Sequence, residues 1–465
     1  MKKPSKAMVL LATLAICAGL APAAGFAAEP TTIEVGSSAE FDNAVITVNA
    51  ATSGEYIIKL TDDLEGAGAT FANTCPTTIL GNGHTMTLGQ YSSISVQSGA
   101  QLNLGAADGS DTLKISGGNA QSNDVPGLLY IQGACNMYPG VTVADRKGEN
   151  YFGGGVYVSG GSSFVMNGGT ISNNKANEMG GGVALIASID EIVNGGWGNL
   201  QSSAQILGGT ISENEANDGA GVLASAYFYA AAYGLCADTP NVGAAEKPGL
   251  FLENATITKN TANQDEGYGA GVLAVMLKTP AAAEIRSCTI TENIAALGGG
   301  IASYGNFTSM VIDRCTITGN KAANYGGGFA ADSNSGEGAG TTITDTKLCN
   351  NTAGKAASDI YLDGSLLKLA PAKDMNALYL GKPDDVTNKK IDGWFVDGED
   401  LRYAAQTKEQ RVEYTDYADV SADGKVYLIA AAKPSLVKIS FANEDGSSFY
   451  SEDWYEIGTK AHQII

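Results

Sequence analysis

Few side chains in this sequence have the type and spacing needed for acid–base chemistry. Of the two histidines, His84 lies in the stretch LGNGHT and His462 lies close to the C-terminus. An imidazole titrates near neutral pH and often acts as a general acid or base. The Gly-Asn-Gly that precedes His84 is nevertheless typical of a tight turn. We therefore interpret His84 as a turn residue and His462 as part of a terminal tail, not as catalytic groups.

Two arginines, each of which lies just before a Cys-Thr-Ile stretch, are considered as candidate general bases. Arg286 lies in EIRSCTI and Arg314 in IDRCTI, four and three residues before the isoleucine. Side chains alternate along a strand, so these two offsets place the arginines on different faces. We therefore predict no catalytic role for either. Asp313 beside Arg314 indicates a surface ion pair, worth under about 1 kcal/mol.

Carboxylates and cysteines show no metal-binding pattern. Glu213, Glu215 and Asp218 lie close together, but we interpret them as part of a solvated turn. The calcium-binding nonapeptide GGxGxDxUx is absent. Six cysteines follow the N-terminal leader, and none has the CxxC spacing of zinc or redox sites. We expect neither a metal nor a cofactor.

The start of the chain and its charge indicate a secreted, acidic protein. Residues 1–28 have the basic start, apolar core and small-residue cleavage region of a signal peptide. The mature chain then has 25 basic and 49 acidic residues, a net charge of −24. This charge repels phosphate backbones and anionic membranes. We therefore expect an extracellular or cell-surface protein with no nucleic-acid partner and no transmembrane helix in the mature chain.

A repeated motif indicates the secondary-structure elements that would position any catalytic or binding side chains. A motif of the form TI-x-x-N-x-A recurs, and each full copy is followed by a glycine cluster and an apolar residue, such as GGGV ending at Val183. The motif isoleucines are 40, 46, 33 and 27 residues apart, and a degenerate copy follows after 31. The copies begin at Thr170, Thr210, Thr256, Thr289, Thr316 and Lys347.

This repeat predicts a parallel β-helix. Periods of this size are typical of solenoids and propellers, but 27 residues hardly accommodate the four strands of a propeller blade. No helical segments separate the copies. Short strands joined by tight turns fit one coil per repeat, with glycines at bends that need a positive φ. We predict an all-β chain: a right-handed parallel β-helix (solenoid) with an N-terminal cap and a small C-terminal β-rich region.

The repeated asparagines are interpreted as structural. Stacked coils place equivalent residues about 4.8 Å apart, so identical side chains form ladders. Each amide is expected to donate to the next carbonyl along the column and to adopt the bend conformation itself. Catalysis would need one special residue, whereas every copy carries the same one. The predicted ladder is Asn174, Asn214, Asn260, Asn293, Asn320 and Asn351.

Two cysteines occupy equivalent places in neighbouring coils. Cys288 and Cys315 each lie two residues before a motif isoleucine, so both are expected to face inward and stack. Stacked parallel side chains keep their Cβ atoms further apart than the roughly 3.8 Å that a disulfide prefers. We predict a pair of buried free thiols that behave as small hydrophobic groups.

The GGG-V and TI-x-x-N-x-A alternation resembles the right-handed parallel β-helix repeats of secreted bacterial proteins, including the passenger regions of polymorphic outer membrane proteins. Relatives of this kind include adhesins, and pectate-lyase-like and polygalacturonase-like enzymes, so the resemblance implies a fold more than an activity. Polygalacturonase-like enzymes use a Gly-His-Gly stretch, but Thr85 follows His84 and their NTD and RIK motifs are absent. After Pro434, VKISFANEDGSSFYSEDWYEIG resembles the β-grasp-like repeats of internalin-type surface proteins.

These patterns divide the chain into four parts. Ser37 and Glu40 form a capping-box pattern, which predicts a short amphipathic helix over the first coil. The predicted parts are a signal peptide (1–28), a parallel β-helix with this N-terminal capping helix (29–365), a β-rich extension (366–433) and a partial β-grasp-like repeat (434–465).

Two insertions are the candidate binding surface. The two longest repeats are adjacent, and their extra length follows the glycine-cluster strand in both. Such insertions project from one side of a solenoid and often carry binding. Aromatic rings beside carboxylates suit sugars, although the same residues could simply cover apolar surface. The candidate ligand-binding residues are Asp190, Glu191, Trp197, Tyr227, Phe228, Tyr229 and Tyr233.

The sequence therefore favours a non-catalytic adhesin, binding or stalk module, secreted or displayed on the cell surface. Its expected partner is an extracellular polysaccharide or a host or neighbouring surface protein. The alternative is a polysaccharide lyase or glycoside hydrolase built on the same β-helix.

Overall fold

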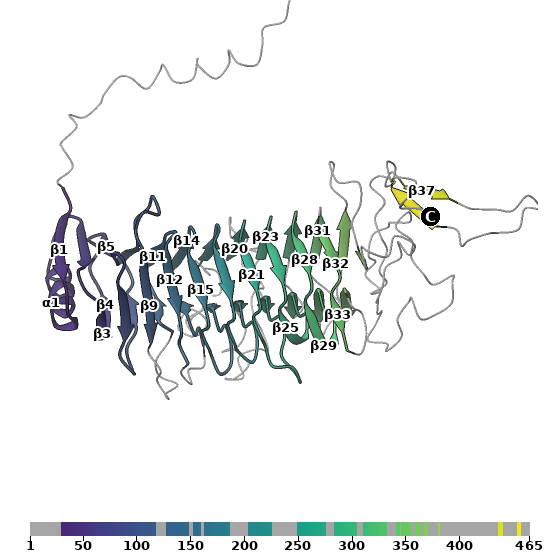
Figure 1. The fold of residues 1–465 in the computed structure, drawn as a ribbon, viewed down its shortest axis with the longest axis horizontal. Helices are drawn as coiled ribbons and strands as arrows, with labels where there is room; N and C mark the ends of the chain where they lie inside the picture. Colours follow the sequence, from purple (N-terminus) through teal and green to yellow (C-terminus); the bar gives the residue numbers. More distant parts are fainter. Residues whose placement is uncertain are drawn as a thin grey trace, which may run out of the picture.

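The chain folds as a right-handed parallel β-helix, which Figure 1 shows from the side as a row of stacked strands. The computed structural model describes residues 29–117, 127–147, 152–159, 162–186, 203–225, 249–275, 283–304, 310–332, 341–344, 346–354, 359–363, 367–370, 380–381, 436–439 and 453–456. Within these ranges the only helix lies at the N-terminal end, and nearly all other regular structure is parallel strand.

Each full coil supplies one strand to each of three parallel sheets, which we call sheets A, B and C. Equivalent strands of successive coils pair with each other, which brings the repeat into register. In sheet B, for example, Ile171 pairs with Ile211, Ile211 with Ile257, and Ile257 with Ile290. One repeat is therefore one coil, and the unequal spacings between repeats come from connections of different length between the strands.

The strands are distributed as follows. Sheet A holds β1 (Thr31–Val35), β2 (Tyr56–Leu60), β5 (Thr77–Leu80), β8 (Gln101–Leu104), β11 (Ala134–Met137), β14 (Ser163–Met166), β17 (Ser203–Ile206), β20 (Leu250–Glu253), β23 (Ala283–Arg286), β27 (Met310–Asp313), β31 (Thr341–Thr344) and β35 (Leu367–Ala370). Sheet B holds β3 (Leu64–Ala67), β6 (Thr85–Leu88), β9 (Leu113–Gly117), β12 (Val141–Ala144), β15 (Thr170–Ser172), β18 (Thr210–Ser212), β21 (Thr256–Thr258), β24 (Thr289–Thr291), β28 (Thr316–Thr318), β32 (Lys347–Cys349) and β36 (Leu380–Gly381). Sheet C holds β4 (Ala69–Phe71), β7 (Ile94–Val96), β10 (Leu129–Ile131), β13 (Val156–Val158), β16 (Val183–Ile186), β19 (Val222–Ser225), β22 (Val272–Val275), β26 (Ile301–Tyr304), β30 (Phe329–Asp332) and β34 (Ile360–Asp363).

Two smaller sheets complete the described strands. A short parallel sheet after the asparagine bend contains β25 (Ile294–Leu297), β29 (Lys321–Tyr325) and β33 (Thr352–Ala353). Strands β37 (Leu436–Ile439) and β38 (Asp453–Glu456) form an antiparallel pair in the C-terminal region. Sheets A and B continue past residue 365, since β35 pairs with β31 and β36 with β32.

Helix α1 (Ser38–Asn49) packs on the first coil, against β1 to β4. The Ser37 side chain accepts the backbone N–H of Glu40, as the capping-box pattern predicts. The Glu40 carboxylate accepts the N–H of Gly36 at 2.8 Å, one residue before the N-cap. Four apolar residues of α1 are buried, so the helix shields the apolar end of the solenoid.

The core is a column of inward-facing aliphatic side chains enclosed by the three sheets. Strands of sheets A and B alternate between buried and partly exposed residues, as in β20 and β21. This period of two points the motif isoleucines into the core, where each is fully buried. The outward positions of sheet B carry mainly threonine and serine, which favour strands.

Candidate functional site

The six repeat asparagines form one buried hydrogen-bonded column at the bend that follows sheet B. In each step Nδ2 donates to the Oδ1 of the asparagine one coil further on, at 2.9–3.1 Å. The backbone N–H of the donor residue reaches the same oxygen. A further bond from Nδ2 reaches a backbone carbonyl, as from Asn293 to Ile257 at 3.0 Å. The members are Asn174, Asn214, Asn260, Asn293, Asn320 and Asn351, all buried.

Different groups close this ladder at its two ends. At the C-terminal end, the carboxylate of Asp359 accepts both the backbone N–H and the Nδ2 of Asn351, at 3.2 and 3.0 Å. At the other end, the backbone N–H of Arg146 donates to the Oδ1 of Asn174. Arg146 occupies the ladder position of its own coil, and burial lowers the pKa of its guanidinium to about 10. Each amide thus joins neighbouring coils, which is a structural role.

The bend itself is made by a different residue than the sequence suggested. The positive φ belongs to the residue before each ladder asparagine, such as Asn173 at 54° and Lys259 at 58°. The ladder asparagines are absent from the residues with positive φ in the described chain. The expectation that they adopt the bend conformation was therefore wrong: they sit one position later, where the side chain turns inward.

The glycine clusters serve two separate purposes. Their first glycine has a positive φ, for example 70° at Gly180 and 55° at Gly269, as expected for a sharp bend. Their third glycine lies against the ladder. A Cβ on Gly182 would be 3.0 Å from Nδ2 of Asn214 and 2.5 Å from the carbonyl oxygen of Gly221. The glycine leaves the space that the amide column occupies.

His84 lies in a tight turn, as interpreted from the sequence. Its backbone N–H donates to the carbonyl of Gly81 at 2.8 Å, and Asn82 and Gly83 both have positive φ. Its Nδ1 is 3.4 Å from a carboxylate oxygen of Asp63. That oxygen also accepts the N–H of Thr85, so it organises the turn. His462 lies outside the described residues.

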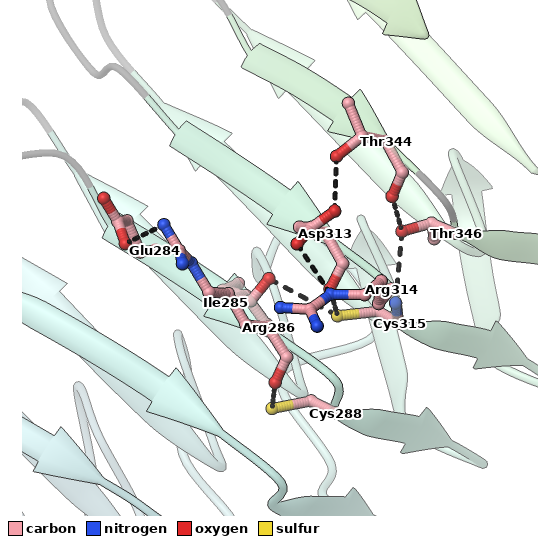
Figure 2. A network of polar contacts seen from close by, with 9 residues as sticks. All are labelled: Glu284, Ile285, Arg286, Cys288, Asp313, Arg314, Cys315, Thr344 and Thr346. Carbon is pink, nitrogen blue, oxygen red and sulfur yellow. Dashed lines mark hydrogen bonds and ion pairs between the residues drawn. The ribbon is translucent and has the colours of Figure 1, made fainter. Parts of the chain in front are cut away.

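The two candidate bases, Arg286 and Arg314, are each held by a carboxylate close by in sequence (Figure 2). Nη2 of Arg286 lies 2.9 Å from Oε2 of Glu284. Nε of Arg314 donates to Oδ2 of Asp313 at 2.9 Å, and the other oxygen of Asp313 accepts the hydroxyl of Thr344. An arginine side chain stays positively charged, so both contacts are structural ion pairs on the outer side of sheet A.

Figure 2 also shows the two stacked cysteines beneath these ion pairs. Cys288 and Cys315 are buried free thiols. Sγ of Cys288 is 3.2 Å from the carbonyl oxygen of Arg286, and Sγ of Cys315 is 3.4 Å from that of Ile285. The contact with Cys288 and burial raise the pKa of the Cys315 thiol. Such a thiol is a poor nucleophile at neutral pH.

The three carboxylates of the TISENEAND copy have different surroundings. Glu213 and Glu215 are exposed, as expected for a solvated turn. Asp218 is half-buried instead: burial, with the negative charges of Glu178 and Glu266, raises the pKa of its carboxyl group to about 6. The interpretation of Asp218 as a solvated turn residue was therefore wrong. In the other copies the residue before the glycine cluster is apolar, so an aspartate at this position is the sequence signal that marks Asp218 as unusual.

The outer face of sheet C is apolar, unlike the outer faces of sheets A and B. All four residues of β16 are buried, including Ala184 and Ile186, which do not belong to the central core. Aromatic rings lie along this face, with Tyr268 and Tyr304 5.2 Å apart and Tyr130 and Tyr157 stacked at 5.4 Å. The buried members of this outer cluster are Met179, Ala184, Ile186, Leu223, Leu273, Val275 and Ala302.

The predicted ligand-binding residues lie outside the described residues, but their attachment points do not. Residues 187–202 join β16 to β17, and residues 226–249 join β19 to β20. Both insertions leave the end of a sheet C strand and lead into sheet A, on neighbouring coils. The candidate residues in them are Asp190, Glu191, Trp197, Tyr227, Phe228, Tyr229 and Tyr233.

In the ranges that the structure covers, no group of three or more His, Cys, Asp or Glu side chains is arranged to hold a metal ion. The one described helix, α1, is too short to cross a membrane, and no other candidate span occurs among those residues. Comparison with protein-family models, with curated proteins and with solved structures finds no match to this chain.

Proposed function

We propose that this protein is a secreted or cell-surface binding module, in which a rigid acidic β-helix presents two insertions to an extracellular glycan or a surface protein. The observation that supports it most directly is topological. Both insertions leave sheet C on neighbouring coils, so their bases are held side by side by paired strands. Loops carried on a rigid scaffold are where binding residues are usually found.

The scaffold supports this reading by its regularity. The amide ladder, the aliphatic core and the in-register strands repeat the same contacts from coil to coil. In the regular coils the interior side chains and the bends make the same stacking contacts. The coils therefore differ mainly in the length of the connection from sheet C to sheet A. A repetitive core with local insertions suits a stalk that displays a binding surface.

The runner-up function is cleavage of a polysaccharide. In the described region the two arginines considered as bases are both engaged by carboxylates. Binding without cleavage therefore remains the proposal, and a reducing-end release assay on acidic and neutral polysaccharides separates the two. Release of new reducing ends by the purified mature protein would replace binding with catalysis.

Trp197 provides the direct test of binding. The mature protein and its Trp197→Ala variant are measured against immobilised neutral and acidic polysaccharides. If the insertion stacks on sugar rings, the variant loses about 1 kcal/mol of binding free energy or more, with an unchanged melting temperature. Trp394→Ala, outside both insertions, is the matched control and keeps full binding. A lower melting temperature with unaltered binding would mean that Trp197 covers apolar surface instead.

A further inference from the structure

One carboxyl group interrupts an apolar column at the edge of sheet C. The residue directly before each glycine cluster lies in this column, where bridges join Met179 to its neighbours in the preceding and following coils. Asp218 takes this place in the coil between β18 and β19. The other members are Phe152, Met179, Tyr268, Leu297 and Tyr325.

Backbone hydrogen bonds hold Asp218 between two coils. Its N–H donates to the carbonyl of Glu178 at 2.8 Å, and its own carbonyl accepts the N–H of Gly180 at 3.0 Å. On the other side, Oδ1 accepts the backbone N–H of Tyr268 at 2.7 Å. The next residue, Gly219, donates to the carbonyl of Tyr268 at 2.9 Å. The carboxyl group therefore cannot leave the column without releasing the N–H of Tyr268.

The charged groups around Asp218 are mainly negative. Glu178 in the preceding turn and Glu266 in the following turn both raise its pKa, after the larger effect of burial, while the N–H of Tyr268 lowers it. The one cation with a described partner at this corner, Lys175, pairs with Glu215 at 3.6 Å. The charged residues of the three stacked turns are Lys175, Glu178, Glu213, Glu215, Lys259, Asp265 and Glu266.

We propose that Asp218 makes this corner of the β-helix pH-sensitive, because its carboxyl group packs well between Met179 and Tyr268 when neutral and poorly when ionised. The inference does not depend on the proposed binding function. The pKa of the folded-state group, about 6, lies above its ordinary value of 3.8. The neutral carboxyl group therefore stabilises the folded corner fully below pH 4, and this stabilisation is lost as the pH rises through 6. The affected corner includes both coils that carry the insertions and the coil of Tyr268 that follows them.

Local hydrogen exchange measures this effect directly. Exchange is followed by mass spectrometry at pH 5 and pH 7.5 in peptides covering Asp218 to Ser225 and Glu266 to Val272, corrected for the intrinsic pH dependence. A peptide around β8 is the internal reference. In the wild-type protein we expect the opening equilibrium of the corner peptides to rise about tenfold, relative to β8, from pH 5 to pH 7.5.

Two variants separate titration from hydrogen bonding. Asp218→Asn keeps an oxygen acceptor for the N–H of Tyr268 but cannot ionise, so its corner should change less than twofold between the two pH values. Asp111→Asn is the control, since the Asp111 carboxylate likewise accepts hydrogen bonds from the backbone, those of the Gly81 and Asn82 N–H groups. It should keep the wild-type response at the corner. An Asp218→Asn protein with the same pH response as wild type would overturn the proposal.

Discussion

The third glycine of one repeat and the ladder asparagine of the next coil depend on each other. A Cβ on Gly271 would lie 3.1 Å from Nδ2 of Asn293 and 2.3 Å from the carbonyl oxygen of Gly300. The second contact is with backbone, which cannot rotate away. The glycine cluster and the asparagine are therefore two halves of one packing arrangement, although about twenty residues separate them in the chain.

Gly271→Ala tests this dependence. We expect the added methyl group to push the coils apart and to lower the free energy of unfolding by about 1–3 kcal/mol. Chemical denaturation followed by circular dichroism measures the change. Gly208→Ala is the matched control, because a Cβ there meets one atom, the carbonyl oxygen of Asn167, at a comfortable 3.6 Å. Equal stability of the two variants would contradict the packing argument.

Asn293→Leu tests the ladder in mid-column. The leucine removes the hydrogen bonds to Asn320 and Ile257 and leaves buried partners unsatisfied, so we expect a loss of about 1–3 kcal/mol. Asn136→Leu is the control, because Asn136 donates to Asn103 at 2.9 Å on the partly exposed outer face of sheet A. Solvent can replace that bond, so its loss should cost less. A ladder variant as stable as wild type would show that the amides contribute little.

The strongly repeated features of this chain were predictable from its sequence, and the features that break the repeat were harder to predict. Six copies of one motif indicate which residues stack on each other in successive coils. The one-coil repeat, the inward isoleucines and the buried asparagines follow from this periodicity. The residue with positive φ was placed one position too late, because asparagine, glutamate, lysine and glycine all occur at the true bend. Composition alone does not reveal such a position.

The surroundings of two carboxylates, Asp218 and Asp359, were not predicted from the sequence, for a different reason. Each replaces another residue type in the repeat: Asp218 stands where the other copies have an apolar residue before the glycine cluster, and Asp359 stands at the position of the third glycine. Asp218 interrupts an apolar column, and Asp359 ends an amide ladder. The groups around Asp218 come from the preceding and following turns, whereas the side-chain partner of Asp359 is Asn351, earlier in the same coil. For Asp218, the local sequence alone predicts a solvated turn residue.

Asp359 is expected to close the ladder through its acceptor oxygen. Asp359→Asn retains an oxygen for the N–H and Nδ2 of Asn351 and should change the free energy of unfolding by less than about 1 kcal/mol. Asp359→Leu removes the acceptor and should cost about 1–3 kcal/mol. Denaturation midpoints of the two variants measure the difference. If asparagine and leucine are equally destabilising, the carboxylate acts through its charge and not through these bonds.

The stacked cysteines give a prediction about covalent state. Cys288 and Cys315 are buried, and each thiol lies near a backbone carbonyl. We expect alkylation of both to be slow in the native protein and complete after unfolding without reductant, because burial excludes the reagent and the raised pKa of Cys315 keeps it protonated. Cys135 serves as a comparison, since burial alone raises the pKa of its thiol to about 12. It too should react only after unfolding. A Cys288–Cys315 bridge recovered by peptide mapping of protein secreted by its host would contradict the prediction, because stacked side chains on parallel strands do not converge as a disulfide requires.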